Sequence, residues 1–347
     1  MAARLAGVAA VFAVAALASG NAHAEADSFG FGSGHAGNFV VSAPNTVVNA
    51  YAAVTAAVAA NATSITVDAT TGFAAGDLVM IWKSTGLGLA RAPGVQTTVP
   101  MDGDSTGTFE FARVKAAAGT TITLTAPVVS AFAANQSQVI RIPEYDNLGV
   151  AAGGSIAATP WNGAKGGIVV LFAASGVFNA GTIAANGVGL RGGLQRRDTT
   201  IFGCAALDGP VSGLAANTTN ALAGGAKKGE GLFPNSYSTD TTTDATNALG
   251  PLYPTYGYGN VSSGGGGGDC HNSGGAGGGH GGLGGTGGHT YDGDVGILND
   301  GERPFGGKGG AIIQYTATAR MVMGGGGGAG EDNDGKGTGG AAGGGVV

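Results

Sequence analysis

Residues 264–288 read GGGGGDCHNSGGAGGGHGGLGGTGG, and this glycine tract is the most specific structural signal in the sequence. Sixteen of its 25 residues are glycine, and from His280 to His289 one side chain follows every two glycines. Three residues per turn is the period of the polyproline II helix, so these side chains would line one edge and leave two bare faces. The stretch therefore predicts a bundle of polyglycine II segments bonded backbone to backbone. A flexible linker is the alternative, because ordering glycine costs much backbone entropy.

A second glycine tract covers residues 324–345, and its run of five glycines begins 60 positions after that of the first tract. Between the two tracts, residues 309–323 resemble two short strands, so we expect glycine tracts and β-strands to alternate. The sequence stops at GGVV (344–347), which matches the GGIV at 166–169 where a strand is expected to begin. We therefore expect the chain to be a piece of a longer protein.

Residues 149–193 contain very short apolar runs bounded by glycine or asparagine. Such runs suit a solenoid, whose successive turns bury one face against the next. The sequence thus predicts an irregular parallel β-helix over 149–347. Residues 194–263, rich in Thr, Asn, Pro and Tyr without a period, are expected to form an inserted loop. The runs that carry the prediction are 153–156, 166–171, 176–179 and 181–187.

Residues 25–148 alternate apolar and polar side chains in short runs rich in β-branched residues, which is typical of half-buried strands. This length is enough for a small antiparallel barrel or sandwich. The alanine-rich run Tyr51–Ala60 is expected to form one short helix. The whole protein is therefore predicted to be all-β, with strands near 64–67, 77–82, 109–114, 121–125 and 139–142.

The N-terminus has the features of a secretory signal peptide, residues 1–24. Arg4 precedes an apolar run from Leu5 to Ala18, and Ala22-His23-Ala24 has the small residues that signal peptidase requires. The run is short for a membrane anchor, which is the alternative, and no later segment approaches about 20 apolar residues. We expect an extracellular or cell-surface protein without a transmembrane segment after signal cleavage.

The amino-acid composition limits the classes of molecule that this protein is expected to bind. The chain has 16 Lys+Arg against 22 Asp+Glu, and only 11% of its residues are charged, whereas nucleic-acid binding needs a basic surface. The chain has 72 glycines, which is an unusually high number. However, 43% of its residues are hydrophobic, which is more than an intrinsically disordered chain contains. We expect glycan or envelope-protein partners and no nucleic acid.

No motif predicts a catalytic residue, a cofactor or a metal. Residues 187–192 match the dinucleotide fingerprint, but no amphipathic helix follows to hold a pyrophosphate. His271, His280 and His289 are nine residues apart, about 28 Å in polyproline II geometry, so they would not reach one ion. Residues 150–197 contain no Asp or Glu, so the best solenoid turns carry no carboxylate pair for glycoside hydrolysis.

Two small groups of residues remain as candidates. Cys204 and Cys270 would form a disulfide in an oxidising compartment, and two free thiols are the alternative. Tyr253, Tyr256 and Tyr258 lie between prolines and glycines and would contact a ligand as an exposed aromatic patch. Packing of these rings onto the solenoid is the alternative.

Several strings together resemble a known group of proteins. Residues 47–51, 72–79, 139–145, 161–163 and 189–193 are similar to glycine-rich surface proteins known in myxobacteria as adventurous gliding motility proteins, and 324–345 resembles their glycine-rich repeats. The resemblance covers most of the chain after residue 24, implies a surface location, and carries over no catalytic residue. That family continues well past such a tract, which also implies that this chain is truncated.

The sequence thus predicts an exported structural or adhesive cell-surface protein that is not an enzyme, with an association with gliding or the envelope. The alternative is a carbohydrate-binding or polysaccharide-processing β-helix protein, which would need an aromatic groove beside a carboxylate pair. A third reading, an ice-binding glycine bundle, would need a flat regular row of identical side chains, and the residues His, Leu and Thr do not provide one.

Overall fold

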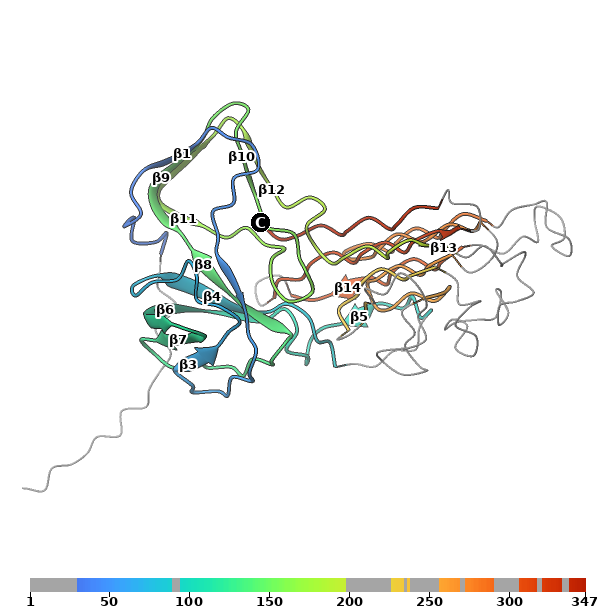
Figure 1. Cartoon of the computed structure of the whole chain (residues 1–347), viewed down its shortest axis with the longest axis horizontal. Coiled ribbons are helices and arrows are strands. Elements are labelled where there is room, and N and C mark those ends of the chain that lie inside the picture. The colour runs from blue at the N-terminus through green and yellow to red at the C-terminus, as the bar shows by residue number, and fades with distance from the viewer. Residues whose placement is uncertain are drawn as a thin grey trace, which may run out of the picture.

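A computed structural model describes residues 30–88, 94–197, 226–233, 236–237, 256–268, 272–289, 306–316, 320–332 and 337–347. The segment predicted as a signal peptide (1–24), Cys204, Cys270, His271 and Tyr253 lie outside these residues. Every regular element in the described part is a β-strand, so the all-β prediction is confirmed there. Figure 1 shows the longer strands gathered in one half of the molecule and long extended segments running side by side in the other.

Fifteen strands are described, and most are short. They are β1 (Phe39–Val41), β2 (Tyr51–Ala53), β3 (Ser64–Thr66), β4 (Leu78–Lys83), β5 (Val99–Pro100), β6 (Phe109–Ala118), β7 (Thr121–Leu124), β8 (Ser137–Ile142), β9 (Glu144–Val150), β10 (Ser155–Ala157), β11 (Phe172–Asn179), β12 (Thr182–Ala184), β13 (Arg196–Arg197), β14 (Ile313–Gln314) and β15 (Glu331–Asp332).

The largest sheet is antiparallel, with the strand order β2-β8-β4-β6-β7-β3. β4 lies between β8 and β6 and is buried along its whole length. Its side chains alternate between two cores, as a period of two requires. Leu78, Met80 and Trp82 face one core, and Val79 and Ile81 face the other. Burial of each such side chain stabilises the fold by roughly 1.5–3 kcal/mol.

Hydrogen bonds also connect the two outermost strands of this sheet. Val54, just after β2, forms an antiparallel bridge with Val67, just after β3, and the amide of Thr55 donates to the carbonyl of Thr66. The helix expected over Tyr51–Ala60 is therefore wrong. β-Branched side chains in this run lose rotamer freedom in a helix and pack well in a sheet, and strand pairing decides the conformation.

A second, parallel sheet has the order β1-β9-β11. Leu148 in β9 pairs with Phe39 on one side and with Val177 on the other. Further along, Ile156 pairs in parallel with Thr46 and with Ile183. Three chain segments therefore stack in the same direction, as a solenoid requires.

The antiparallel sheet is inserted between the first two of these stacked segments. β1 precedes it and β9 follows it, yet the two strands are hydrogen-bonded. The expected division between an N-terminal domain, residues 25–148, and a solenoid from residue 149 is therefore not the arrangement found. Residue 148 lies within β9, and β1 belongs to the parallel sheet.

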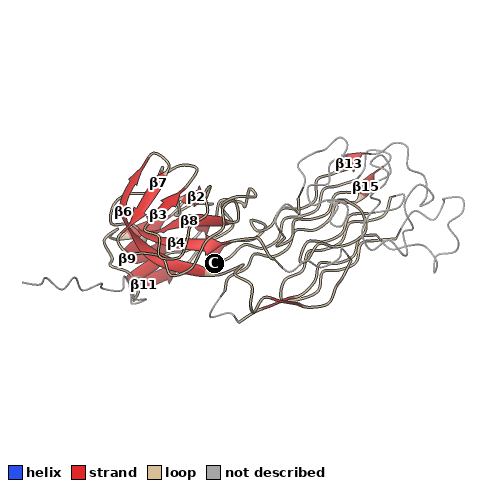
Figure 2. Cartoon of the chain, turned by 90° about the horizontal axis from the view of Figure 1, so that it is seen from below, coloured by secondary structure: helices blue, strands red, loops and turns tan. Residues whose placement is uncertain are grey.

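The glycine tracts form the other half of the molecule. Apart from the two-residue pairs β13–β15 and β14–β5, their segments are drawn as loops in Figure 2, yet their backbones are hydrogen-bonded to one another throughout. Trp82 joins this half to the antiparallel sheet, because its indole Nε1 donates to the carbonyl of Met321 at 3.0 Å. Met323 and Val322 are buried in the same core as Trp82.

Part of the expected inserted loop, 194–263, belongs to the glycine half instead. The amides of Ala226 and Gly229 donate to Gly268 and Gly265, and residues 226–233 are all buried. A Cβ on Gly229 would lie 2.0 Å from the carbonyl oxygen of Gly326, so this segment has the same close approach of backbones as the glycine-rich tracts. Only two of its eight residues are glycine, and they are not consecutive, so the segment did not stand out as a glycine-rich tract.

Candidate functional site

The segment Gly324–Glu331 has hydrogen-bonded neighbours on several sides. The direction in which its amides donate repeats every three residues, so that residues three apart donate to the same neighbouring segment, at 2.8–3.2 Å. Residues 324 and 327 donate to the segment 338–346, residues 325 and 328 to 273–280, and residues 326 and 329 to 226–231. Its carbonyls accept from residues 190 and 193 and from residues 265 and 268. A strand in a sheet has hydrogen-bonded neighbours only at its two edges, whereas this segment bonds to five other segments.

Glycine is required at these positions because the backbones touch. A Cβ added to Gly326 would lie 1.9 Å from the carbonyl oxygen of Arg191, and one added to Gly325 would lie 1.8 Å from that of Ser263. No real side chain fits at such distances. The glycines of this tract therefore allow neighbouring backbones to lie in direct contact.

The segment 281–289 forms an outer edge of this bundle. The amides of Gly284 and Gly287 donate to Gly310 and Gly307, whereas a Cβ on Gly285 or Gly288 would meet nothing within 4 Å. The intervening side chains are exposed, with Leu283 at 51%. One face of the edge is thus bonded to the bundle, and the other presents backbone and small side chains to solvent.

Of the three predicted ligand-contact tyrosines, the structure describes Tyr256 and Tyr258, and their surroundings differ. Tyr256 is only 3% exposed and bridges to Lys227, so its ring packs inside the protein. Tyr258 is half-buried, and the Lys308 ammonium lies 5.5 Å from its ring centre. The interpretation of Tyr253, Tyr256 and Tyr258 as ligand contacts stays a prediction, and the buried Tyr256 ring favours the packing alternative at that position.

His280 and His289 stand at the two ends of the outer segment, with different surroundings. His280 Nε2 lies 3.0 Å from the carbonyl oxygen of Val322 and 3.4 Å from the Tyr315 hydroxyl, whereas His289 is exposed. No group of three or more His, Cys, Asp or Glu side chains is placed to hold a metal ion within the described segments. None of the described residues forms a helix that could cross a membrane.

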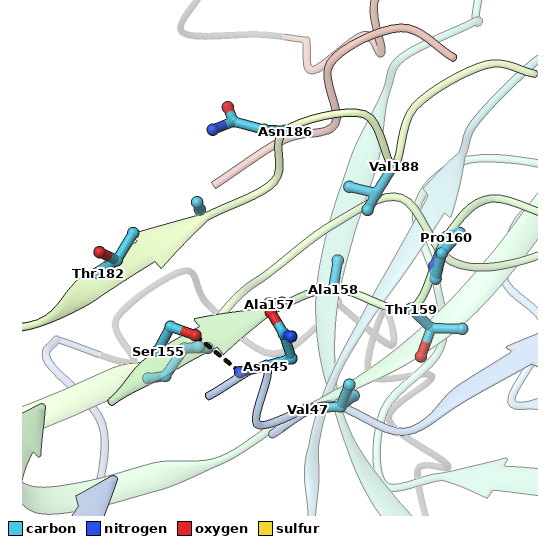
Figure 3. A pocket seen from close by; sticks show the side chains of 12 residues that line it. Asn45, Val47, Ser155, Ala157, Ala158, Thr159, Pro160, Thr182, Asn186 and Val188 are labelled. Carbon is cyan, nitrogen blue, oxygen red and sulfur yellow. Dashed lines mark hydrogen bonds between the residues drawn. The ribbon is translucent and has the colours of Figure 1, made fainter. Parts of the chain in front are cut away.

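A hollow of about 610 Å³ lies over the stacked parallel segments (Figure 3). Ser155 and Thr182 come from the paired strands β10 and β12, and Asn45 comes from the turn after β1. The Asn45 amide donates to Ser155 Oγ at 2.7 Å. Asn186 and Thr159 complete the polar part of the lining, and the rest is aliphatic. None of the described residues that line this hollow has a charged or aromatic side chain.

A buried carboxylate, Glu230, organises a second site. Arg191 donates to it through Nε and NH2, both at 2.9 Å, and the Trp161 indole donates at 3.1 Å. Arg191 also donates through NH1 to the carbonyl of Asn162 at 3.1 Å. A Cβ on Gly163 would lie 2.6 Å from Arg191 NH2. Two strings that are far apart in the sequence, 161–163 and 189–193, therefore meet around one carboxylate that the sequence did not single out.

This charged cluster opens into a hollow of about 280 Å³. The Arg191 guanidinium lies 3.9 Å from the centre of the Tyr237 ring, which forms part of the wall. Burial raises the pKa of Tyr237, with Arg191 lowering it and Glu230 raising it further, so the phenol stays protonated. The lining consists of Thr85, Ala134, Asn135, Gln136, Gly163, Arg191, Glu230, Phe233, Ser236 and Tyr237.

Only one carboxylate lines this hollow, and none lines the hollow in Figure 3. Glycoside hydrolysis uses two carboxyl groups on either side of the scissile bond. Neither hollow, as lined by the described residues, contains such a pair.

Comparison with known proteins adds no family. No protein-family model and no curated protein matches the sequence. Similar solved structures include the tailspike gp61 of Pseudomonas phage phi297 (13% identity, 42% of this chain and 23% of that chain, TM-score 0.21). The gp54 tailspike of Acinetobacter baumannii bacteriophage AP22, solved with A. baumannii capsular saccharide, has 10% identity over 42% of this chain and 27% of that chain, with a TM-score of 0.22. The tailspike gp49 of Pseudomonas phage LKA1 has 16% identity over 36% of this chain and 27% of that chain, with a TM-score of 0.21.

This chain thus spans about a quarter of the length of each tailspike. At TM-scores of 0.21 and 0.22 the likeness carries no argument about the fold or the activity of this chain.

Proposed function

We propose that this protein is an exported structural or adhesive element of the cell surface, and that it is not an enzyme. The observation that carries the proposal is the three-residue rotation of hydrogen bonds along Gly324–Glu331. We assign the glycine segments to polyglycine II, because a three-fold helix presents successive amides in three directions. Such a bundle holds a long, thin structure together through its backbone, with little apolar surface.

The remaining parts fit a surface role. Residues 1–24 supply an export signal by their sequence, and the resemblance to gliding motility proteins would place the chain on the envelope. The stacked segments β1, β9 and β11 would form the start of an irregular parallel β-helix, and the antiparallel sheet, whose outer strands are joined through Val54 and Val67, would form a small barrel beside it.

Amide hydrogen exchange on the chain lacking residues 1–24 tests the bundle residue by residue. The amides of Gly284 and Gly287 donate to carbonyls, whereas those of Gly285 and Gly288 have no hydrogen-bond acceptor among the described residues. We expect Gly284 and Gly287 to exchange on the order of 100-fold more slowly than their neighbours, an opening free energy of about 2.7 kcal/mol. Uniformly fast exchange along 281–289 would show a flexible linker and would overturn the bundle.

Location and adhesion need separate assays. Antibody labelling of intact cells that express the full chain should detect the protein at the surface, and replacing Ala22 and Ala24 with large residues should retain it inside, because signal peptidase requires small residues there. Cells that display the protein should attach to glycan-coated surfaces better than cells without it. Detection only inside the cell would contradict export, and equal attachment would contradict adhesion.

A carbohydrate-binding protein is the second candidate. The observation that favours it is the presence of two hollows with polar groups in their lining on the described surface, one of about 610 Å³ over the parallel strands and one of about 280 Å³ beside Glu230. Glycoside hydrolysis uses two carboxyl groups, whereas the described residues that line the two hollows include one carboxylate, Glu230. Release of reducing sugar from a polysaccharide by the purified protein would overturn the non-enzymatic proposal.

A further inference from the structure

We infer that the hollow beside Glu230 is a binding site for one neutral sugar ring of a surface glycan. This inference rests on the proposed adhesive role, because it names the class of ligand that such a protein would hold. The hollow, of about 280 Å³, is just below the range of about 300–1,000 Å³ found for drug-sized ligands, so it suits something as small as a single ring.

The guanidinium in the site is fixed before any ligand arrives. Three of the five N–H groups of Arg191 are bonded, two to Glu230 and one to the Asn162 carbonyl, which leaves two without an acceptor among the described residues. The Tyr237 ring lies against the guanidinium and limits its movement. A fixed donor loses little entropy on binding.

The charge of the site selects a neutral ligand. The Glu230 carboxylate already occupies the Nε and NH2 side of Arg191, one of the two sides on which a guanidinium can bind a carboxylate or phosphate with two hydrogen bonds. The charges of the two side chains cancel, and the other described residues that line the hollow are uncharged. An anionic ligand would therefore meet the charge of the Glu230 carboxylate and a guanidinium whose charge that carboxylate already balances.

The other lining groups suit hydroxyls and a C–H face. The side-chain amides of Asn135 and Gln136 make no hydrogen bond to any described residue, and each offers both a donor and an acceptor. Sugar hydroxyls need both. The aromatic side chains of Phe233 and Tyr237 supply apolar wall on which the C–H face of a ring could pack.

Asn135 allows a clean test, because its backbone has a φ of 58°, in the left-handed region that glycine also adopts readily. Asn135→Gly thus removes the amide without straining the chain. Asn61 has a φ of 66° and does not line the hollow, so Asn61→Gly is a matched control. Tyr237→Ala removes the half-buried ring as a second, independent change.

The experiment measures binding of glucose, galactose, mannose and N-acetylglucosamine, with glucuronate as the anionic comparison, each at millimolar concentration. Binding is followed by saturation-transfer NMR and titration calorimetry. We expect at least one sugar to bind the unaltered protein, about tenfold weaker binding by Asn135→Gly and by Tyr237→Ala, and unchanged binding by Asn61→Gly. If Tyr237→Ala does not fold, Asn135→Gly decides alone.

Three results would overturn the inference: no binding of any of the four sugars, binding that Asn135→Gly leaves unchanged, or binding of glucuronate in preference to the neutral sugars. Hydrogen exchange on the same samples reports on the glycine bundle independently. A protected bundle without sugar binding would remove this site and leave the structural role standing, whereas sugar binding with an unprotected bundle would do the reverse.

Discussion

Replacing Gly326 with alanine should break the glycine bundle at its centre. The added Cβ would lie 1.9 Å from the carbonyl oxygen of Arg191, and ordinary contact begins at 3.4 Å, so the two backbones would have to separate by about 1.5 Å (3.4 minus 1.9). Gly326 also donates to Glu230 at 3.0 Å and accepts from Gly265 at 2.9 Å. A shift of this size would disrupt both hydrogen bonds.

The expected cost follows from these two effects. Overpacking of a tight interior typically costs about 1–3 kcal/mol. The loss of two backbone hydrogen bonds adds about 1 kcal/mol each. Gly326→Ala should therefore lower the free energy of unfolding by about 3–5 kcal/mol, a large part of the roughly 5–15 kcal/mol available to a typical domain.

Gly285→Ala is the matched control, because its Cβ would meet nothing within 4 Å. It should leave stability unchanged or raise it by about 0.4–1 kcal/mol, since alanine restricts the unfolded chain more than glycine does. Urea unfolding followed by circular dichroism and by tryptophan fluorescence would measure both variants. Equal stability of Gly326→Ala and Gly285→Ala would refute the packing argument.

Two further predictions concern side-chain contacts between the antiparallel sheet and its neighbours. Burial raises the pKa of Glu144, but hydrogen bonds from Arg113 and from the Ser33 amide, with the Arg113 charge, outweigh it and hold that pKa below its usual range. A lowered pKa stabilises the fold at neutral pH and the contribution disappears as the pH falls below about 4, so Glu144→Gln should flatten the loss of stability between pH 7 and pH 3, and unchanged slopes would count against this ion pair. Trp82→Phe should cost about 1–3 kcal/mol in urea unfolding, because the Met321 carbonyl loses its indole donor in a buried place, and a cost under about 0.5 kcal/mol would contradict that role.

The sequence predicted the strands well where the alternation was strong. The run Asp77–Trp82 was expected as a strand, and β4 covers Leu78–Lys83. The run Tyr51–Ala60 was expected as a helix and contains β2 instead. Alanine favours a helix locally, but pairing of Tyr51 with Ile140 and burial of the neighbouring alanines outweigh that preference.

The candidate site was only partly visible in the sequence. The strings around Trp161 and Arg191 were singled out as part of a resemblance, without a role. Glu230 was not singled out, because a lone acid within a stretch read as a loop carries no spacing signal. Tyr237 was likewise passed over for the cluster 253–258. Nothing local indicates that residues 161, 191 and 230 meet.

The sequence by itself determined the two periods, two residues for the strands and three for the glycine tracts, because each period is set by the geometry of a single extended chain. Tertiary structure alone decided which segments became neighbours. It placed the antiparallel sheet between β1 and β9, added residues 226–231 to the bundle and brought Arg191 to Glu230. The cost of closing a loop grows only slowly with its length, so separation along the chain does not select a partner. The partner is selected by the close fit of whole backbones and by the burial of one charge against another.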